Sequence, residues 1–178
     1  MKIERIETHG EEQRIRQDFG VSELCAKVLA CRCQDDEQIR QVLNQDLTLH
    51  PCQSPELTQI LKRLDTARQR HEKVLIAGDY DADGLCATAI MKEALDRAGI
   101  VSGFYIPHRL NEGYGLSAQT VQLARDKGYS LILTVDNGVA AHPALTLAKQ
   151  LGVEVIVTDH HVIQQEPECL TLLHPTRM

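Results

Sequence analysis

Three aspartates at alternate positions follow a short apolar stretch. Asp79, Asp81 and Asp83 come directly after the aliphatic run 74–77, whose composition favours a strand. Alternate residues of an extended chain point to the same side, so we expect the three carboxylates to crowd together. Without a cation they would repel one another, and hard divalent ions such as Mg²⁺ or Mn²⁺ bind carboxylate oxygens and water. The segment therefore predicts a site for one or two such ions.

Two other interpretations compete for the same segment. The pattern Asp-x-Asp-x-Asp-Gly also opens the calcium loop of an EF-hand, but that loop needs a bidentate glutamate at its twelfth position, where this chain has Ile90. The run 74–77 also predicts a strand, and not a helix, before the loop. A solvated acidic turn is the remaining alternative. The hard-metal site is favoured over both.

Polar residues follow two further predicted strands. The run 131–135 ends at Asp136, and the run 153–158 ends at the Asp-His-His sequence of 159–161. In parallel sheets ligands bind at the carboxyl ends of the strands, so we expect these residues to converge on one edge. Carboxylates and imidazole from several strands commonly assemble a two-metal hydrolytic site with the ions about 3.5–4 Å apart. Mn²⁺ suits this mixed oxygen and nitrogen set better than Ca²⁺ does.

From Lys73 onward, strand patterns alternate with helix patterns. Such alternation predicts an α/β fold with a mostly parallel sheet and helices on both faces. The predicted strands are 74–77, 102–106, 131–135 and 153–157. The predicted helices are 85–98, a helix capped by Ser117 that ends before Gly128, and a helix from Pro143 to Gly152.

The first part of the chain has only helical patterns. Helices are predicted over 21–32, over 35–45 and from Ser54-Pro55 to about residue 70. We therefore expect two regions, a helical N-terminal segment of residues 1–72 and a catalytic core of residues 73–178. The helices of the first region carry no pattern that indicates chemistry.

Composition limits the classes of function. The 178 residues include 19 Lys and Arg against 25 Asp and Glu, a net charge of −6, which argues against a basic nucleic-acid clamp. No apolar run approaches the length of a membrane span, and the polar start is not typical of a secretory signal, so a cytoplasmic protein without a membrane partner is expected. The six cysteines include no C-x-x-C pair and are interpreted as reduced thiols.

The aspartate and histidine motifs together resemble a known family. Asp-Tyr-Asp-Ala-Asp-Gly at 79–84, Asp-Asn-Gly at 136–138 and Asp-His-His at 159–161 are similar to the first three motifs of the DHH phosphoesterase superfamily. Within it, the segment 106–116 resembles the Pro-x-Arg…Gly-Tyr-Gly segment of the bacterial RecJ branch of single-strand-specific DNA exonucleases. The helical leader up to residue 71 also resembles the start of RecJ proteins.

The resemblance implies metal-dependent phosphodiester hydrolysis by a 5′-to-3′ exonuclease that acts on single-stranded DNA in repair and recombination. It implies Mn²⁺ or Mg²⁺ as cofactor, with two ions in the complete protein, and a single-strand-binding protein and a helicase as further partners. Other members of the superfamily hydrolyse short oligonucleotides, cyclic dinucleotides or pyrophosphate. A catalytically incomplete metal-binding fragment is the non-enzymatic alternative.

Carried onto this chain, the resemblance implies roles for particular residues. The implied metal ligands are Asp81, Asp83, Asp136 and His160, with Asp79 close to the metals. Asp159 and His161 join His160 as implied catalytic residues, either orienting the ligands or meeting the scissile phosphate. His161 is the candidate for proton handling.

The segment between the first two motifs supplies candidate substrate contacts. Arg109 lies between a predicted strand and a helix, where it could bind a phosphate with two hydrogen bonds or form a surface salt bridge. Tyr114 could stack on a base or pack under its own loop, and Gly113 permits a backbone turn toward a ligand.

The chain departs from the family pattern after the third motif. RecJ proteins carry a fourth motif with another metal-binding aspartate, followed by a substrate-binding domain, and neither is recognised before residue 178. We therefore expect a truncated core, with one metal site incomplete.

Overall fold

The computed structural model describes residues 8, 10–44, 53–108 and 113–177. The chain forms two compact units, Met1–Pro51 and Cys52–Met178. Each unit has its own hydrophobic core, and each is described by itself below.

The described residues of the first unit form three helices, α1 (Glu11–Phe19), α2 (Glu23–Arg32) and α3 (Asp36–Asn44). Their core is formed by Ile15, Ala26, Leu29 and Ile39. The predicted helical N-terminal segment is therefore present. The pattern had not indicated α1 as a separate helix.

The second unit is built on a five-stranded sheet in which every neighbouring pair is parallel. The strand order is β2-β1-β3-β4-β5. The strands are β1 (Lys73–Ala77), β2 (Ser102–Tyr105), β3 (Tyr129–Val135), β4 (Glu154–Thr158) and β5 (Thr171–Leu173). The predicted α/β fold with a mostly parallel sheet is confirmed.

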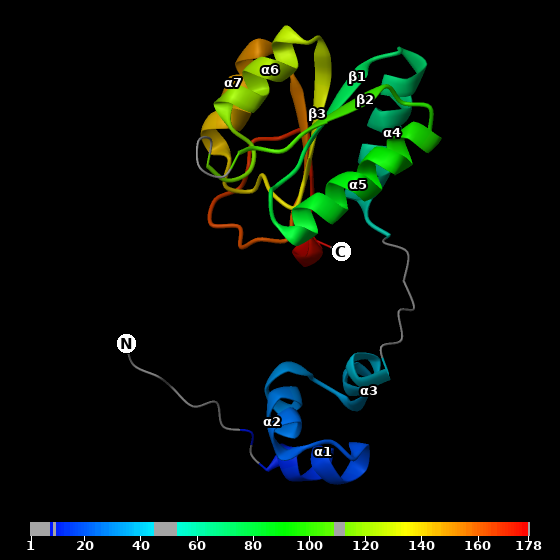
Figure 1. The fold of residues 1–178 in the computed structure, drawn as a ribbon, viewed down its shortest axis with the longest axis vertical. Helices are drawn as coiled ribbons and strands as arrows, with labels where there is room; N and C mark the ends of the chain where they lie inside the picture. Colours follow the sequence, from blue (N-terminus) through cyan, green and yellow to red (C-terminus); the bar gives the residue numbers. More distant parts are fainter. Residues whose placement is uncertain (1–7, 9, 45–52, 109–112, 178) are drawn as a thin grey trace. The chain divides into compact units, whose positions relative to one another are not determined.

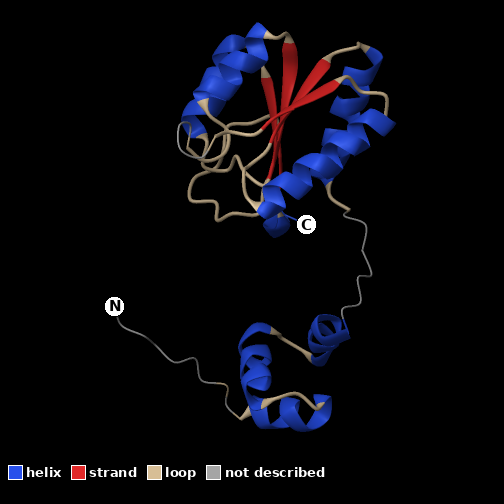
Figure 2. Ribbon diagram, in the orientation of Figure 1, coloured by secondary structure: helices blue, strands red, loops and turns tan. Residues whose placement is uncertain are grey.

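Helices cover both faces of the sheet (Figures 1 and 2). On one face, α4 (Pro55–Gln69) and α5 (Ala82–Arg97) pack on Leu131 and Leu133 of β3. On the other face, α6 (Ala118–Asp126) and α7 (His142–Leu151) pack on Ile132 of the same strand. This alternation follows from strand geometry, since successive side chains point to opposite faces.

Helix α4 differs from the expected division of the chain. The sequence pattern assigns it to the N-terminal segment of residues 1–72, whereas its Ile60 and Ala67 lie in the core with Val74 and Ile76 of β1. The compact unit with the sheet therefore begins at Cys52. The apolar stripe of a helix shows that it packs against something, but does not identify the partner.

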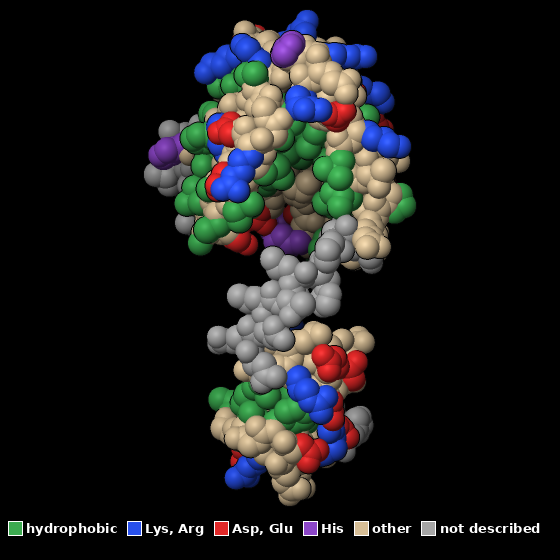
Figure 3. All heavy atoms as spheres, turned by 90° about the vertical axis from the view of Figure 1, so that its right-hand side faces the viewer, with side chains coloured by type: hydrophobic (Ala, Val, Ile, Leu, Met, Phe, Trp, Pro, Cys, Tyr) green, Lys and Arg blue, Asp and Glu red, His purple; other side chains and the backbone are tan. Residues whose placement is uncertain are grey.

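A hollow remains between the two helices of this face. Helices α4 and α5 and the sheet enclose a cavity of about 490 Å³, lined by Leu61, Leu64, Met91 and Leu95 among others. Figure 3 turns this side toward the viewer and shows hydrophobic side chains in the hollow. Within the described ranges, no helix is long and apolar enough to cross a membrane.

The strand order places a crevice between β1 and β3. The chain leaves β1 toward β2 on one side and later returns to β3 on the other, so the order reverses between these neighbours. In open α/β sheets the carboxyl ends at such a reversal form the usual ligand site. The loops that follow β1 and β3 begin with the aspartate motifs of the sequence.

Candidate metal centre

The loops after β1, β3 and β4 bring their acidic and imidazole side chains together. Ligand atoms of Asp81, Asp83 and Asp136 lie within 4.8 Å of one another, and so do those of Asp136, His160 and His161. Asp136 belongs to both groups. The predicted convergence of three strand ends is therefore present in the fold.

Asp81 and Asp83 meet for a different reason from the one expected. Helix α5 begins at Ala82, and not at residue 85 as the pattern predicts. Asp81 is its N-cap, whose Oδ1 accepts a hydrogen bond of 3.1 Å from the N–H of Gly84, and Asp83 lies in the first turn. The extended alternation expected for residues 79–83 is therefore wrong at its second half. A helix N-terminus also favours acidic side chains, because its free N–H groups carry partial positive charge.

The local backbone lowers the pKa of Asp83. Its carboxylate accepts a hydrogen bond from its own N–H, and the neighbouring side chain of Asp81 acts in the same direction. Asp83 is therefore ionised at neutral pH and available as a ligand.

Asp79 lies beneath this pair and belongs to neither group. The residue is fully buried, and neither carboxylate oxygen has a hydrogen-bond partner among the described residues. Gly84 packs so closely that a Cβ there would lie 2.9 Å from both the Cβ and the backbone oxygen of Asp79. Burial raises the pKa of Asp79, and the charges of Asp81 and Asp136 raise it further.

Asp136 occupies the point where the two groups overlap. Its backbone is left-handed, with φ of 63°, a conformation that aspartate adopts more readily than most residues. Its Oδ1 lies 2.7 Å from Nε2 of His160, whereas its Oδ2 is buried and has no hydrogen-bond partner within the described ranges. Burial raises the pKa of Asp136, and the contact with His160 partly opposes this effect.

Asn137 holds this strand end in place, a role that the motif alone did not reveal. Its Nδ2 donates to the backbone oxygens of Ala77 at 3.0 Å and Val135 at 2.9 Å. Its Oδ1 accepts from the N–H of Leu116 at 3.0 Å. One buried amide therefore connects the ends of β1 and β3 to the loop before α6. The position of Asn137 between the predicted ligand and a glycine was the only signal available in the sequence.

Asp159 orients the histidines. Its Oδ1 accepts hydrogen bonds from the N–H groups of His160 and His161 at 2.7 and 3.0 Å, and its Oδ2 accepts from the N–H of Val139 at 2.9 Å. Burial opposes ionisation, but these hydrogen bonds lower the pKa of Asp159. The carboxylate also lies 2.7 Å from Nδ1 of His161 and raises the pKa of that ring.

Tyr114 closes the other side of His161. Its hydroxyl lies 3.1 Å from Nε2 of His161 and donates to the backbone oxygen of Asp136 at 3.2 Å. Its ring also packs edge-on against Tyr80 and His161, with centroids 6.3 and 5.8 Å away. Gly113, just before it, has φ of 83°, which supports the predicted backbone turn. Arg109 lies outside the described residues.

A second residue that sequence reasoning did not select is His174. It is buried beyond β5, and its Nε2 donates to the backbone oxygen of His161 at 2.8 Å. Its Nδ1 accepts from the N–H of Thr176 at 3.3 Å. His174 therefore stabilises the backbone of the Asp-His-His turn through this hydrogen bond to His161.

The donor set fits a divalent cation. In the described part of the chain, no lysine or arginine forms an ion pair with these carboxylates, two of which contact the rings of His160 and His161 instead. Buried carboxylate oxygens without partners, as in Asp79 and Asp136, are costly unless a positive charge lies nearby. Carboxylate oxygens with imidazole nitrogen suit Mn²⁺, and the carboxylates alone suit Mg²⁺.

The fold and this cluster define the class of protein. The family model described as DHH family, N-terminal domain, matches residues 73–178, and the chain belongs to that family. The match contains all three of the motifs that build the cluster.

Within the family, the chain is similar to RecJ proteins. It is 40% identical over 126 residues to the single-stranded-DNA-specific exonuclease RecJ of Bacillus subtilis, and the matched region covers 70% of this chain and 16% of the relative. It is 41% identical over 112 residues to the protein of the same name from Thermus thermophilus, covering 63% of this chain and 17% of the relative. The resemblance predicted from the motifs is confirmed, and the chain spans only a small part of the length of these relatives.

Solved structures agree with the similarity in sequence. The crystal structure of exonuclease RecJ bound to manganese superimposes with a TM-score of 0.67 at 38% identity, covering 72% of this chain and 33% of that one. RecJ of Thermus thermophilus in complex with Mn²⁺ gives a TM-score of 0.64 at 27% identity, covering 94% of this chain and 24% of that one.

Proposed function

We propose that the chain carries the metal centre of a RecJ-like exonuclease, which hydrolyses phosphodiester bonds of single-stranded DNA from the 5′ end. The observation that carries this proposal is the meeting of Asp81, Asp83, Asp136 and His160 from three strand ends. Two relatives that are 40% identical to this chain, over 126 and 115 residues, are named single-stranded-DNA-specific exonucleases. The biological setting proposed on this basis is DNA repair and recombination in the cytoplasm.

The proposed cofactor is Mn²⁺ or Mg²⁺, with two ions in the complete protein. Asp81, Asp83, Asp136 and His160 would hold them, with the buried Asp79 adding negative charge from below. When bound, such ions supply an acidified water as nucleophile and neutralise charge on the phosphate oxygens.

The chain's own residues position this chemistry. The left-handed backbone of Asp136 and the hydrogen bonds of the next residue, Asn137, hold Asp136 in place. Its carboxylate can therefore belong to both ligand groups. Asp159 holds the ring of His161 through Nδ1, which leaves Nε2 directed toward Tyr114 and the cluster. His161 is therefore suited to donate a proton or a hydrogen bond to an oxygen of the scissile phosphate.

Substrate contacts are proposed for the segment before α6. Arg109 would bind a phosphate of the DNA, and Gly113 would let the loop approach it. Tyr114 contacts the catalytic histidine directly, so its hydroxyl orients His161 while its half-exposed ring remains available to a base. A single-strand-binding protein and a helicase remain partners predicted by family resemblance alone.

Digestion of a labelled oligonucleotide tests the proposal. The chain is incubated with Mn²⁺ and a 3′-labelled single-stranded DNA, beside Asp81→Ala and Asp136→Ala. Asp126→Ala serves as a matched control, because Asp126 is exposed at the end of α6 and belongs to neither ligand group. We expect stepwise shortening from the 5′ end, lost by more than about 100-fold in both cluster variants and retained in the control.

Two results would contradict the proposal. Equal cleavage by the parent chain and both cluster variants would place the activity outside this centre. No cleavage by the parent chain would favour the incomplete metal-binding fragment. A series of oligonucleotide lengths separates the remaining alternative, since a phosphodiesterase for dinucleotides loses activity as the substrate grows.

A further inference from the structure

A cavity of about 430 Å³ adjoins the candidate metal centre. It lies between the first residues of α6 and α7 and the loops that follow β3 and β4. His161 and Tyr114 form part of its wall, and His161 also belongs to the ligand group with Asp136. The cavity and the cluster therefore share the side chain of His161, and a ligand held at the cluster lies beside the cavity.

The cavity wall is mainly apolar. Leu116, Val139, Pro143 and Val162 contribute to it, and none of the described residues that line it is a lysine or arginine. Its acidic member, Asp159, has both oxygens engaged by backbone N–H groups. A phosphate would lose its hydration there without gaining a lysine or arginine partner. An uncharged ring is the better occupant, and the volume lies in the range of about 300–1,000 Å³ typical of small-molecule sites.

The polar side chains in the cavity wall already form hydrogen bonds within the protein. The hydroxyl of Ser117 accepts from the N–H of Thr120 as the cap of α6. The amide of Asn137 is engaged at both its nitrogen and its oxygen. The hydroxyl of Tyr114 contacts His161 and the backbone of Asp136. The hydrogen bonds of these groups are made to other residues of the protein, so the groups do not present a hydrogen-bonding pattern that distinguishes one base from another.

We propose that this cavity receives the nucleoside adjacent to the scissile phosphate and accepts its base without reading its identity. The proposal rests on the proposed function, because it takes the phosphate to lie at the cluster of Asp136 and His160. The base would then enter past His161 and Tyr114, whose rings stand at the junction. Contact with ring faces and aliphatic groups tolerates every base, because every base has a π-face.

The test compares two ligands that differ only by the base. Thymidine 5′-monophosphate and 2-deoxyribose 5-phosphate are titrated into the ¹⁵N-labelled chain with saturating Mg²⁺, and amide shifts are followed by NMR. We expect the nucleotide to shift the amides of Leu116 and Val139, and the sugar phosphate to leave them unchanged. Deoxyguanosine 5′-monophosphate should shift the same amides with an affinity within about threefold, because stacking tolerates every base.

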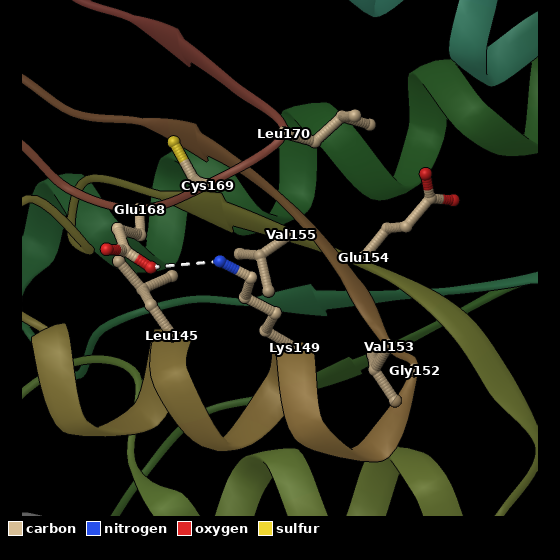
Figure 4. A pocket seen from close by; sticks show the side chains of 9 residues that line it. All are labelled: Leu145, Lys149, Gly152, Val153, Glu154, Val155, Glu168, Cys169 and Leu170. Atoms are coloured by element: carbon tan, nitrogen blue, oxygen red, sulfur yellow. Dashed lines mark hydrogen bonds and ion pairs between the residues drawn. The ribbon is translucent and has the colours of Figure 1, made fainter.

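A second cavity supplies an internal control. It has about 510 Å³ and lies at the opposite end of β4, where Val153 and Leu170 line it together with the paired Lys149 and Glu168 (Figure 4). It shares no lining residue with the cavity beside the cluster. The amides of Val153 and Leu170 should therefore not respond to the nucleotide.

A pair of alanine variants tests the location. Ala118 is an exposed residue that lines the proposed cavity, and Ala118→Leu narrows it. Ala89→Leu adds the same bulk at an exposed position of α5 that lines none of the cavities described above. We expect Ala118→Leu to raise the Kd for thymidine 5′-monophosphate about tenfold, with no change for the sugar phosphate, and Ala89→Leu to leave both unchanged.

Three outcomes would overturn the proposal. They are equal shifts of the cavity amides with both ligands, no response of these amides to the nucleotide, and an unaltered Kd in Ala118→Leu. The measurement needs no turnover, so its failure is distinguishable from the failure of the exonuclease proposal. If the chain cleaves DNA but the amides of the cavity do not respond to the nucleotide, the exonuclease proposal stands and the nucleoside-site proposal is refuted.

Discussion

Replacing Asn137 by aspartate tests whether the buried amide holds the site together. The two side chains have nearly the same shape, so Asn137→Asp creates no void. The change replaces an N–H₂ donor by an oxygen, which then faces the backbone oxygens of Ala77 and Val135 at the distances now spanned by hydrogen bonds of 3.0 and 2.9 Å. An ionised carboxylate in this position would be repelled by both carbonyls.

The size of the effect follows from the way in which the variant can escape this repulsion. The new side chain can take up a proton, and neutralising a carboxyl group of ordinary pKa about 3.9 at pH 7 costs about 4 kcal/mol. A protonated carboxyl donates to one carbonyl only, and the loss at the other adds about 1 kcal/mol. We therefore expect a destabilisation of about 5 kcal/mol at pH 7, a large fraction of the about 5–15 kcal/mol that stabilises a typical domain.

The effect must depend on pH with a definite sign. The pKa at position 137 is raised in the folded variant above its value in the unfolded chain, so the folded state holds a proton that the unfolded state releases above about pH 4. Its stability relative to the parent then falls as pH rises, by about 1.4 kcal/mol per pH unit. The expected destabilisation at pH 5 is about 2.5 kcal/mol, roughly half of that at pH 7.

Urea unfolding at pH 5 and pH 7 in EDTA measures this difference. Tyrosine fluorescence reports the second unit, because the chain has no tryptophan and its four tyrosines all lie there. Gln119→Glu is the matched control, since it makes the same amide-to-carboxyl change at an exposed position of α6 and should alter stability by less than about 0.5 kcal/mol. A destabilisation of Asn137→Asp that is equal at both pH values would refute the reasoning.

Three further predictions concern the same cluster. Mn²⁺ should raise the thermal midpoint of unfolding by binding the folded state, and Asp136→Asn should remove most of that gain; an undiminished gain would exclude Asp136 as a ligand. Asp159→Asn should lower the pKa of His161 toward its ordinary value of about 6.5, measured by NMR titration of the metal-free chain, and an unchanged titration would contradict their contact. Gly84→Ala should destabilise the chain by about 1–3 kcal/mol in urea, although alanine is the better helix former, because its Cβ would press on Asp79; a stabilised variant would show that the packing gives way.

The elements of the sheet unit could be predicted because their signals are local. Apolar runs mark the strands, and the hydroxyls of Ser54 and Ser117 cap α4 and α6 by accepting from the N–H groups of Leu57 and Thr120. The order of the strands could not be predicted, since pairing is decided by contacts between distant residues. The sequence pattern predicts the start of α5 at residue 85 and not at Ala82, because alternating aspartates are also compatible with an extended chain. Aspartate is nevertheless a preferred N-cap residue, and Asp81 takes that position.

The convergence of the strand-end residues could be predicted from the sequence, but the contacts that hold them in place could not. The sequence motifs indicate the carboxylate and imidazole side chains that the fold brings together. They did not indicate Asn137 or His174, because each acts through a backbone oxygen on another segment, that of Ala77 in one case and that of His161 in the other. Nor did they show that Asp79 would be fully buried and without a hydrogen-bond partner among the described residues.

The strand order places the loops after β1 and β3, which carry Asp81, Asp83 and Asp136, beside the same crevice. The connection after β1 runs through α5 on one face of the sheet, and the connection after β3 runs through α7 on the opposite face. The two loops therefore diverge, and the crevice between them stays open where the strands end. A change that moves β1 away from β3 would separate Asp81 from Asp136, whereas the same displacement between β1 and β2 would leave the cluster intact. The backbone pairing of β1 with β3 fixes this distance along the strands, and the buried amide of Asn137 adds a connection at their ends, so we expect it to contribute to the spacing of Asp81 and Asp136.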